Sequence, residues 1–228
     1  MSVKPALVSA RKVFDERLKS ALSLYSYAEK IANGTWESIT RWEPLHPRQA
    51  QKIVALCFMD IVAAWEDFVE SCFIRYLAGA TSPSGYKPSL RSGPARSILH
   101  AYQFVSGRPA FKVGAHYLQW QSWSEVISAA RVFYEDGEPF SLLSQLQRER
   151  LGDATKIRNR VAHTSAKCMK DFGVVSRQHV NRVHRGFSVG QLLINKSNKG
   201  FGPAGTNQTY FLHYAHLFDC MAQIVCPK

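Results

Sequence analysis

Acidic residues are scarce in this chain of 228 residues, with 17 aspartates and glutamates against 29 lysines and arginines. The formal net charge is +12, and the sequence pI is about 9.7. A compact protein with this imbalance repels itself, which favours a polyanionic partner such as RNA, DNA or an acidic membrane surface.

Long apolar runs are also missing. The longest, Ile53 to Met59, is far too short to span a bilayer. The first residues contain no apolar stretch of signal-peptide length, and Asp15 and Glu16 argue against a transit peptide. We therefore expect a cytoplasmic protein with no membrane partner.

Cysteines are few and carry no pattern. The five are scattered, with no C-x-x-C pair, which excludes a zinc framework and a thioredoxin-type pair. Free, mostly buried thiols in a reducing compartment are expected. We predict no metal and no cofactor.

The chain contains no internal repeat and no strand series, but 46% of its residues are hydrophobic, enough for a sizeable core. We predict a single all-α domain over 1–228, with loop insertions near 79–94 and 196–207. Helical signals cover residues 7–28, 47–78, 95–105, 122–134, 140–150, 153–165 and 208–225. Residues 187–195 fit a short strand or a helical turn, and 108–121 show no clean period.

One late segment, Thr155 to Ser165, combines an apolar face with unusual polar groups. After Gly152, Asp153 is a suitable N-cap for a helix through this segment. At about 100° per residue, the predicted buried face holds Ala154, Ile157 and Val161. The outward arc holds Arg158, Asn159 and His163.

The surroundings of this segment are strongly basic, and Asp171 is the only acid between residues 156 and 185. Such a field concentrates phosphate-bearing ligands through contacts that weaken with salt. We expect RNA contacts from Lys156, Arg160, Lys167, Lys170, Arg177, Arg182 and Arg185.

The hexapeptide from Arg158 to His163 resembles the R-N-x-x-x-H signature of HEPN domains. The segment Ala63 to Ser71 also resembles the Trp-Glu helix of several HEPN subfamilies, whereas the C-terminal third resembles nothing nameable. The resemblance implies a helical bundle and a metal-independent endoribonuclease that leaves 2′,3′-cyclic phosphate and 5′-OH ends. It further implies a homodimer with a composite active site, in a toxin or phage-defence context, with an antitoxin or regulatory partner.

These residue types suit RNA cleavage, because RNA carries its own nucleophile in the 2′-OH. His163 can transfer a proton near neutral pH, and Arg158 can neutralise charge on the phosphate. Asn159 can orient the imidazole or hold the phosphate. Glu66 is a candidate to hold the Arg158 guanidinium, whereas Glu70 fits an ordinary solvated edge.

Other patterns compete with this site. The looser R-x(4–6)-H pattern also occurs at Arg41–His46, where Pro44 opposes a helix, and at Arg177–His184. The stretch Gly200–Gly205 lacks the second strand and the acid of a dinucleotide site. His213 and His216 have no third ligand, and the aromatic residues of 116–123 fit core packing better than base stacking.

Three alternative functions remain open. The basic segment is also compatible with a structural helix that has a solvated face. The chain could be a non-catalytic helical module that binds RNA or nucleotides, or docks a partner protein. A sequence-specific DNA binder is the third alternative, although no helix-turn-helix stands out.

Overall fold

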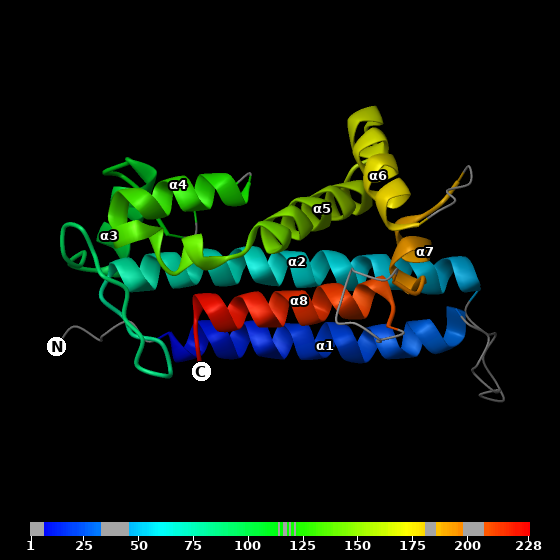
Figure 1. The fold of residues 1–228 in the computed structure, drawn as a ribbon, viewed down its shortest axis with the longest axis horizontal. Coiled ribbons are helices and arrows are strands. Elements are labelled where there is room, and N and C mark those ends of the chain that lie inside the picture. The colour runs from blue at the N-terminus through cyan, green and yellow to red at the C-terminus, as the bar shows by residue number, and fades with distance from the viewer. Residues whose placement is uncertain are drawn as a thin grey trace. The chain divides into compact units, whose positions relative to one another are not determined.

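The computed structural model describes residues 7–32, 46–113, 115, 118, 120, 122–180, 186–197 and 208–228. Within these ranges the protein is all-α, as predicted (Figure 1). The described residues form no strand, only isolated β-bridges between Leu90 and Tyr134 and between Lys196 and Thr209.

The helices follow the apolar periodicity of the sequence. Their bounds are α1 Val8–Ala32, α2 Pro47–Leu77, α3 Ile98–Ser106, α4 Trp123–Phe133, α5 Gln145–Ala162, α6 Ala166–His179, α7 Val189–Ile194 and α8 Tyr210–Val225. Two short 3-10 turns, η1 Glu135–Gly137 and η2 Phe140–Leu142, separate α4 from α5. The predicted loop 79–94 is confirmed, whereas residues 198–207 lie outside the described part of the chain.

Residue contacts divide the chain into two compact units. The first comprises Met1–Asp15, Trp65–Gly152 and Asp219–Lys228, and the second comprises Glu16–Ala64 and Asp153–Phe218. The helices α1, α2, α5 and α8 each contribute residues to both units. The candidate motif lies in the second unit.

The first unit has an aromatic core. The Phe73 ring lies 5.1 Å from the Tyr134 ring and 5.0 Å from the Phe140 ring, centroid to centroid. The buried Tyr134 hydroxyl donates to the Phe73 carbonyl, which attaches the end of α4 to α2. These contacts bury large apolar surfaces and give the buried Tyr134 hydroxyl a hydrogen-bond partner.

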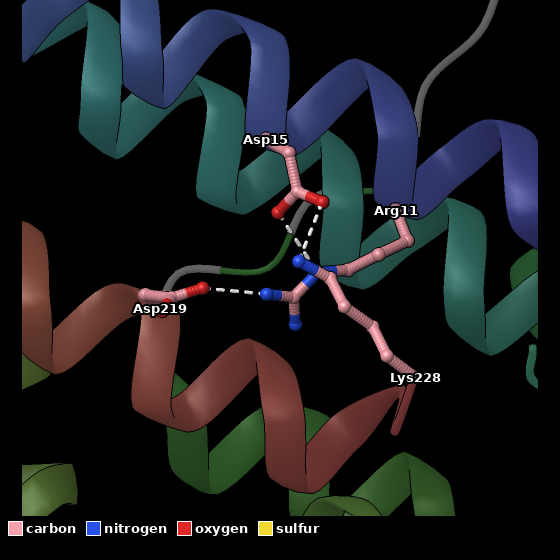
Figure 2. Close-up of polar contacts among 4 residues, drawn as sticks. All are labelled: Arg11, Asp15, Asp219 and Lys228. Atoms are coloured by element: carbon pink, nitrogen blue, oxygen red, sulfur yellow. Dashed lines mark hydrogen bonds and ion pairs between the residues drawn. The ribbon is translucent and has the colours of Figure 1, made fainter. Parts of the chain in front are cut away.

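An ion-pair network around one buried arginine also stabilises the first unit (Figure 2). Arg11 on α1 is almost fully buried and donates to Asp15 at 2.9 Å and to Asp219 at 2.5 Å. Lys228 reaches Asp15 at 2.9 Å. Two carboxylates and two cations balance one another, as a buried guanidinium requires.

The second unit is built around the start of α8. The Phe211 ring stacks on Tyr25 of α1, with centroids 4.0 Å apart and ring planes inclined by only 2°. Phe58 of α2 meets the Tyr214 ring at 5.2 Å. The Tyr25 hydroxyl shares a hydrogen bond of 2.7 Å with the Thr209 hydroxyl. The three helices therefore share one aromatic core in this unit.

The helix α7 settles the open choice at residues 187–195 in favour of a helical turn. Ser188 and Gln191 form a capping box, in which each side chain accepts from the other's backbone N–H. Gly190 allows α7 to approach α2 closely, because a Cβ at this position would lie 2.0 Å from the Gln51 carbonyl oxygen.

One prediction about the motif region is wrong, and one helix was not predicted. Asp153 does not cap a new helix, since α5 runs from Gln145 to Ala162 through Gly152 without a break. The segment 166–179, for which no separate helix was predicted, forms α6 with Ser165 as its N-cap. Its buried Phe172 and Val175 supply the apolar face that periodicity requires.

No helix in the described ranges is both long enough and apolar enough to cross a membrane.

Candidate functional site

The C-terminal half of α5 positions the motif residues. Ile157 and Ala154 are buried, as predicted, and fix the rotation of the helix. Val161 is only half-buried, so the predicted apolar stripe is narrower at its end. With the first two side chains held in the core, the polar residues of the motif lie on the remaining arc of the helix.

Arg158 and Asn159 are joined directly. The Arg158 Nη1 donates to Asn159 Oδ1 at 2.9 Å, and both side chains are half-buried. Because the amide oxygen faces the guanidinium, the Asn159 NH2 group is left to donate elsewhere. The Asn159 amide therefore presents an uncharged N–H donor, next to the positive charge of Arg158, to an acceptor such as a phosphate.

His163 lies immediately beyond the last residue of α5, and not within the helix as predicted. Its backbone N–H still donates to the Asn159 carbonyl at 2.8 Å, so its backbone continues the helical hydrogen-bond pattern. Arg160 Nη1 donates to the His163 carbonyl at 3.2 Å and holds this end of the helix. The His163 side chain is exposed, and its imidazole is therefore accessible to a ligand in solution.

The residues after His163 lead directly into α6. The Ser165 hydroxyl accepts from Cys168 N at 3.3 Å and caps that helix. Three of the predicted RNA contacts, Lys167, Lys170 and Arg177, are exposed along α6. They lie at i, i+3 and i+10, which places them along one side of the helix. Arg182 and Arg185 lie outside the described residues.

Asp153 has a different role from the predicted cap. It is buried, and its carboxylate lies 3.5 Å from Lys156 Nζ and 3.8 Å from His179 Nε2. Lys156, a predicted RNA contact, is thus partly neutralised by an acid one turn away. The carboxylate therefore belongs to the structural core of the second unit.

His179 is the centre of a buried polar cluster that sequence reasoning missed. Its Nε2 lies 3.2 Å from the Tyr214 hydroxyl, and its ring stacks on Tyr210 at 5.1 Å. The Tyr210 hydroxyl donates to the His179 carbonyl. With Asp153, these contacts connect α5, α6 and α8. The only available signal was that His179 follows Phe172 and Val175 on the apolar face of a helix.

The expectations for Glu66 and Glu70 on α2 have different outcomes. Glu66 is half-buried and belongs to the first unit, whereas Arg158 belongs to the second, so its support of that arginine stays a prediction. Glu70 is not a solvated edge, because it accepts from the Tyr102 hydroxyl at 2.9 Å. Burial raises the pKa of Glu70 above its ordinary value, although the Tyr102 hydrogen bond opposes the shift.

The competing patterns lie in part outside the residues that the structure describes. His46 is exposed ahead of α2, and its partner Arg41 lies outside the described residues, as do His184 and the stretch Gly200–Gly205. His213 is buried and His216 is exposed. Across the part of the chain that the structure describes, no group of three or more metal-ligating side chains is found.

The two tryptophans of 116–123 that the structure describes take part in core contacts. Trp123 lies 5.8 Å from the Trp65 ring, and Trp120 lies 5.1 Å from the Phe73 ring. The expectation of core packing is confirmed for both.

Comparisons with known proteins add no relative: no protein-family model, no curated protein and no solved structure matches this chain.

Proposed function

We propose that this protein is a metal-independent endoribonuclease of the HEPN type, with Arg158, Asn159 and His163 as its active residues. The observation that carries the proposal is the arrangement at the end of α5. An exposed imidazole follows one turn after an amide that is hydrogen-bonded to a guanidinium. The R-N-x-x-x-H resemblance supports the same assignment.

The proposed reaction uses only groups of the RNA and the protein. The ribose 2′-oxygen attacks the adjacent phosphorus and loses its proton to a general base. The bond from phosphorus to the 5′-oxygen then breaks, and a general acid supplies a proton to the departing oxygen. The products are a 2′,3′-cyclic phosphate and a 5′-OH. No water is consumed in this step, and no metal is required.

Each side chain has a role in that step. Neutral His163 accepts the 2′-OH proton, and a protonated imidazole is the donor to the 5′-oxygen. Arg158 offers a fixed planar set of donors to the phosphate oxygens as their negative charge increases. Asn159 keeps the guanidinium in place and contributes an uncharged donor. In this proposal two copies of the chain supply the acid and the base, as the resemblance implies.

The exposed cations on α6 support the choice of RNA as substrate. Lys167, Lys170 and Arg177 follow the motif in the chain and provide charge for backbone phosphates. Binding through such contacts weakens with salt. Arg160 has a mixed role, because its guanidinium also holds the His163 carbonyl.

The test is cleavage of a labelled single-stranded RNA in EDTA, with product ends identified by mass spectrometry. We expect 2′,3′-cyclic phosphate ends, and no cleavage where the target nucleotide carries a 2′-deoxyribose. His163→Ala should lower the rate at least ~100-fold. Because His163 is exposed, the melting temperature of the His163→Ala variant should remain close to that of the wild type.

His46→Ala is the matched control, since His46 is also exposed and belongs to a competing pattern. This variant should cleave at the wild-type rate. Full activity in His163→Ala would place the site elsewhere. Salt-sensitive RNA binding without a cyclic-phosphate product would instead identify a non-catalytic binding module.

A further inference from the structure

A long acid-free segment of the sequence lies in the first unit. Residues 71–124 contain six lysines and arginines and no aspartate or glutamate. Five of these cations are exposed, namely Lys87, Arg91, Arg96, Arg108 and Lys112. The segment therefore contributes only positive formal charge to the surface of the first unit, and such charge attracts a polyanionic ligand.

Within this segment, α3 presents a pair of stacked rings to solvent. The Phe104 ring lies 4.1 Å from the His100 imidazole, centroid to centroid, and Phe104 is 52% exposed. The His100 Nδ1 accepts from the Arg96 backbone N–H at 3.2 Å, which holds the imidazole in place and leaves its Nε2 as a donor. A half-exposed phenyl ring on a fixed neighbour offers its exposed surface to a planar ligand such as a base.

The loop that follows α3 is attached to the helix by two contacts. The Gln103 Nε2 donates to the Pro109 carbonyl at 2.7 Å. The Tyr102 ring stacks on the buried Phe111 ring, with centroids 4.9 Å apart and planes inclined by 7°. Arg108 lies between the helix and these two contacts in the chain, so its backbone is held close to the C-terminal end of α3.

The acid that contacts α3 lies on the other side of the helix. Glu70 accepts from the Tyr102 hydroxyl at 2.9 Å, and Tyr102 lies about 200° around the helix axis from Phe104. Arg96 and Arg108 have no ion-pair partner in the part of the chain that the structure describes. The charge of both guanidinium groups is therefore available to an anionic ligand on the side of Phe104.

We propose that Arg96, His100, Phe104 and Arg108 form a binding surface for single-stranded nucleic acid, in addition to the motif on α5. An unpaired base stacks on Phe104, phosphates of the strand meet Arg96 and Arg108, and the His100 Nε2 donates to the same strand. A base that is paired within a duplex is not available for such stacking, so the surface selects single strands. This inference goes beyond the proposed cleavage, because the surface binds the strand whether or not it is cut.

The experiment measures the affinity of the full-length protein for a fluorescent RNA single strand of about 12 nucleotides, by anisotropy at several salt concentrations. Every ribose of the strand is 2′-O-methylated, so the strand has no 2′-OH nucleophile and reports binding alone. Phe104→Ala should weaken binding about 5- to 100-fold, as the loss of one stacked base does. Arg96→Gln combined with Arg108→Gln should reduce the slope of log affinity against log salt by about 1.4, since each phosphate contact on a single strand contributes about 0.7.

Two controls separate this surface from general effects. Tyr27→Ala is the matched control for the ring, because Tyr27 is 53% exposed and lies on α1 in the second unit. Arg48→Gln combined with Arg148→Gln is the control for net charge, because both arginines are exposed and lie outside residues 71–124. Both controls should keep the affinity and the salt slope of the wild type.

The proposal is overturned if the strand does not bind, or if Phe104→Ala binds it as tightly as Tyr27→Ala does. An equal loss of affinity for a duplex of the same sequence would also overturn it, because stacking requires an unpaired base. Phosphatidylserine vesicles that bind through Phe104, without binding of the strand, would identify a membrane surface in its place. Because the methylated strand cannot be cleaved through a 2′-OH, none of these results depends on the outcome of the cleavage assay.

Discussion

The contact between α7 and α2 provides a sharp test of the structure, through Gly190→Ala. A Cβ on Gly190 would lie 2.0 Å from the Gln51 carbonyl oxygen and 2.5 Å from its carbon, whereas ordinary van der Waals contact begins at 3.4 Å. The obstacle is backbone in a helix, which cannot rotate away as a side chain can. The variant therefore has to displace α7 from α2.

The cost follows from that displacement. Overpacking alone costs about 1–3 kcal/mol, and partial exposure of the buried Val189, Leu192 and Leu193 adds to it. Alanine returns at most about 1 kcal/mol through its higher helix propensity. We expect a net loss of about 3 kcal/mol, which corresponds to a fall of about 6–12 °C in melting temperature for a chain of this size.

Gly152→Ala is the matched control, because Gly152 is an exposed glycine inside α5 and a Cβ there would meet nothing within 4 Å. This change should stabilise the protein by about 0.5–1 kcal/mol. Thermal unfolding followed by circular dichroism measures both variants, and hydrogen exchange over 189–194 locates the defect. Equal melting temperatures for the two variants would refute the close approach of α7 to α2.

Two further predictions concern buried polar groups. Burial, assisted by the charge of His216, lowers the pKa of His213 below its ordinary 6.5, so the unfolded chain takes up a proton more readily than the native one. Stability should therefore fall as the pH drops below 6.5, and urea titrations of His213→Leu should show a weaker fall; an unchanged pH slope would contradict this. Tyr134→Phe removes the hydrogen bond to the Phe73 carbonyl and should lower the free energy of unfolding by about 1–2 kcal/mol in urea, and a difference near zero would show that this bond does not stabilise the fold.

Much of the fold was predictable because helical periodicity is a local property. The apolar residues of α2 recur every three or four positions, and Pro47 begins that helix as predicted. The predicted helix at 122–134 corresponds to α4, whose N-cap is Ser122. A helix can be predicted in this way whenever one face is consistently apolar and its ends carry capping residues.

The candidate site was predictable only in part. Spacing alone placed Ile157 in the core and directed His163 outward. Spacing could not show that Arg158 would hydrogen-bond to its neighbour Asn159, because a long flexible side chain has many rotamers of similar energy. The support expected from Glu66 depends on a contact between distant parts of the chain, which no local pattern specifies.

The sequence by itself determined the helical class, most helix positions and the basic character of the motif region, since each follows from residues close together in the chain. Only the tertiary structure decided the role of Asp153. From the sequence, an aspartate that caps a helix cannot be distinguished from a buried aspartate that lies beside His179. The difference becomes visible only when α6 is placed against α5. The stacking of Phe211 on Tyr25 was likewise decided by the fold, because pairing between distant residues depends on how helices pack and not on their periodicity.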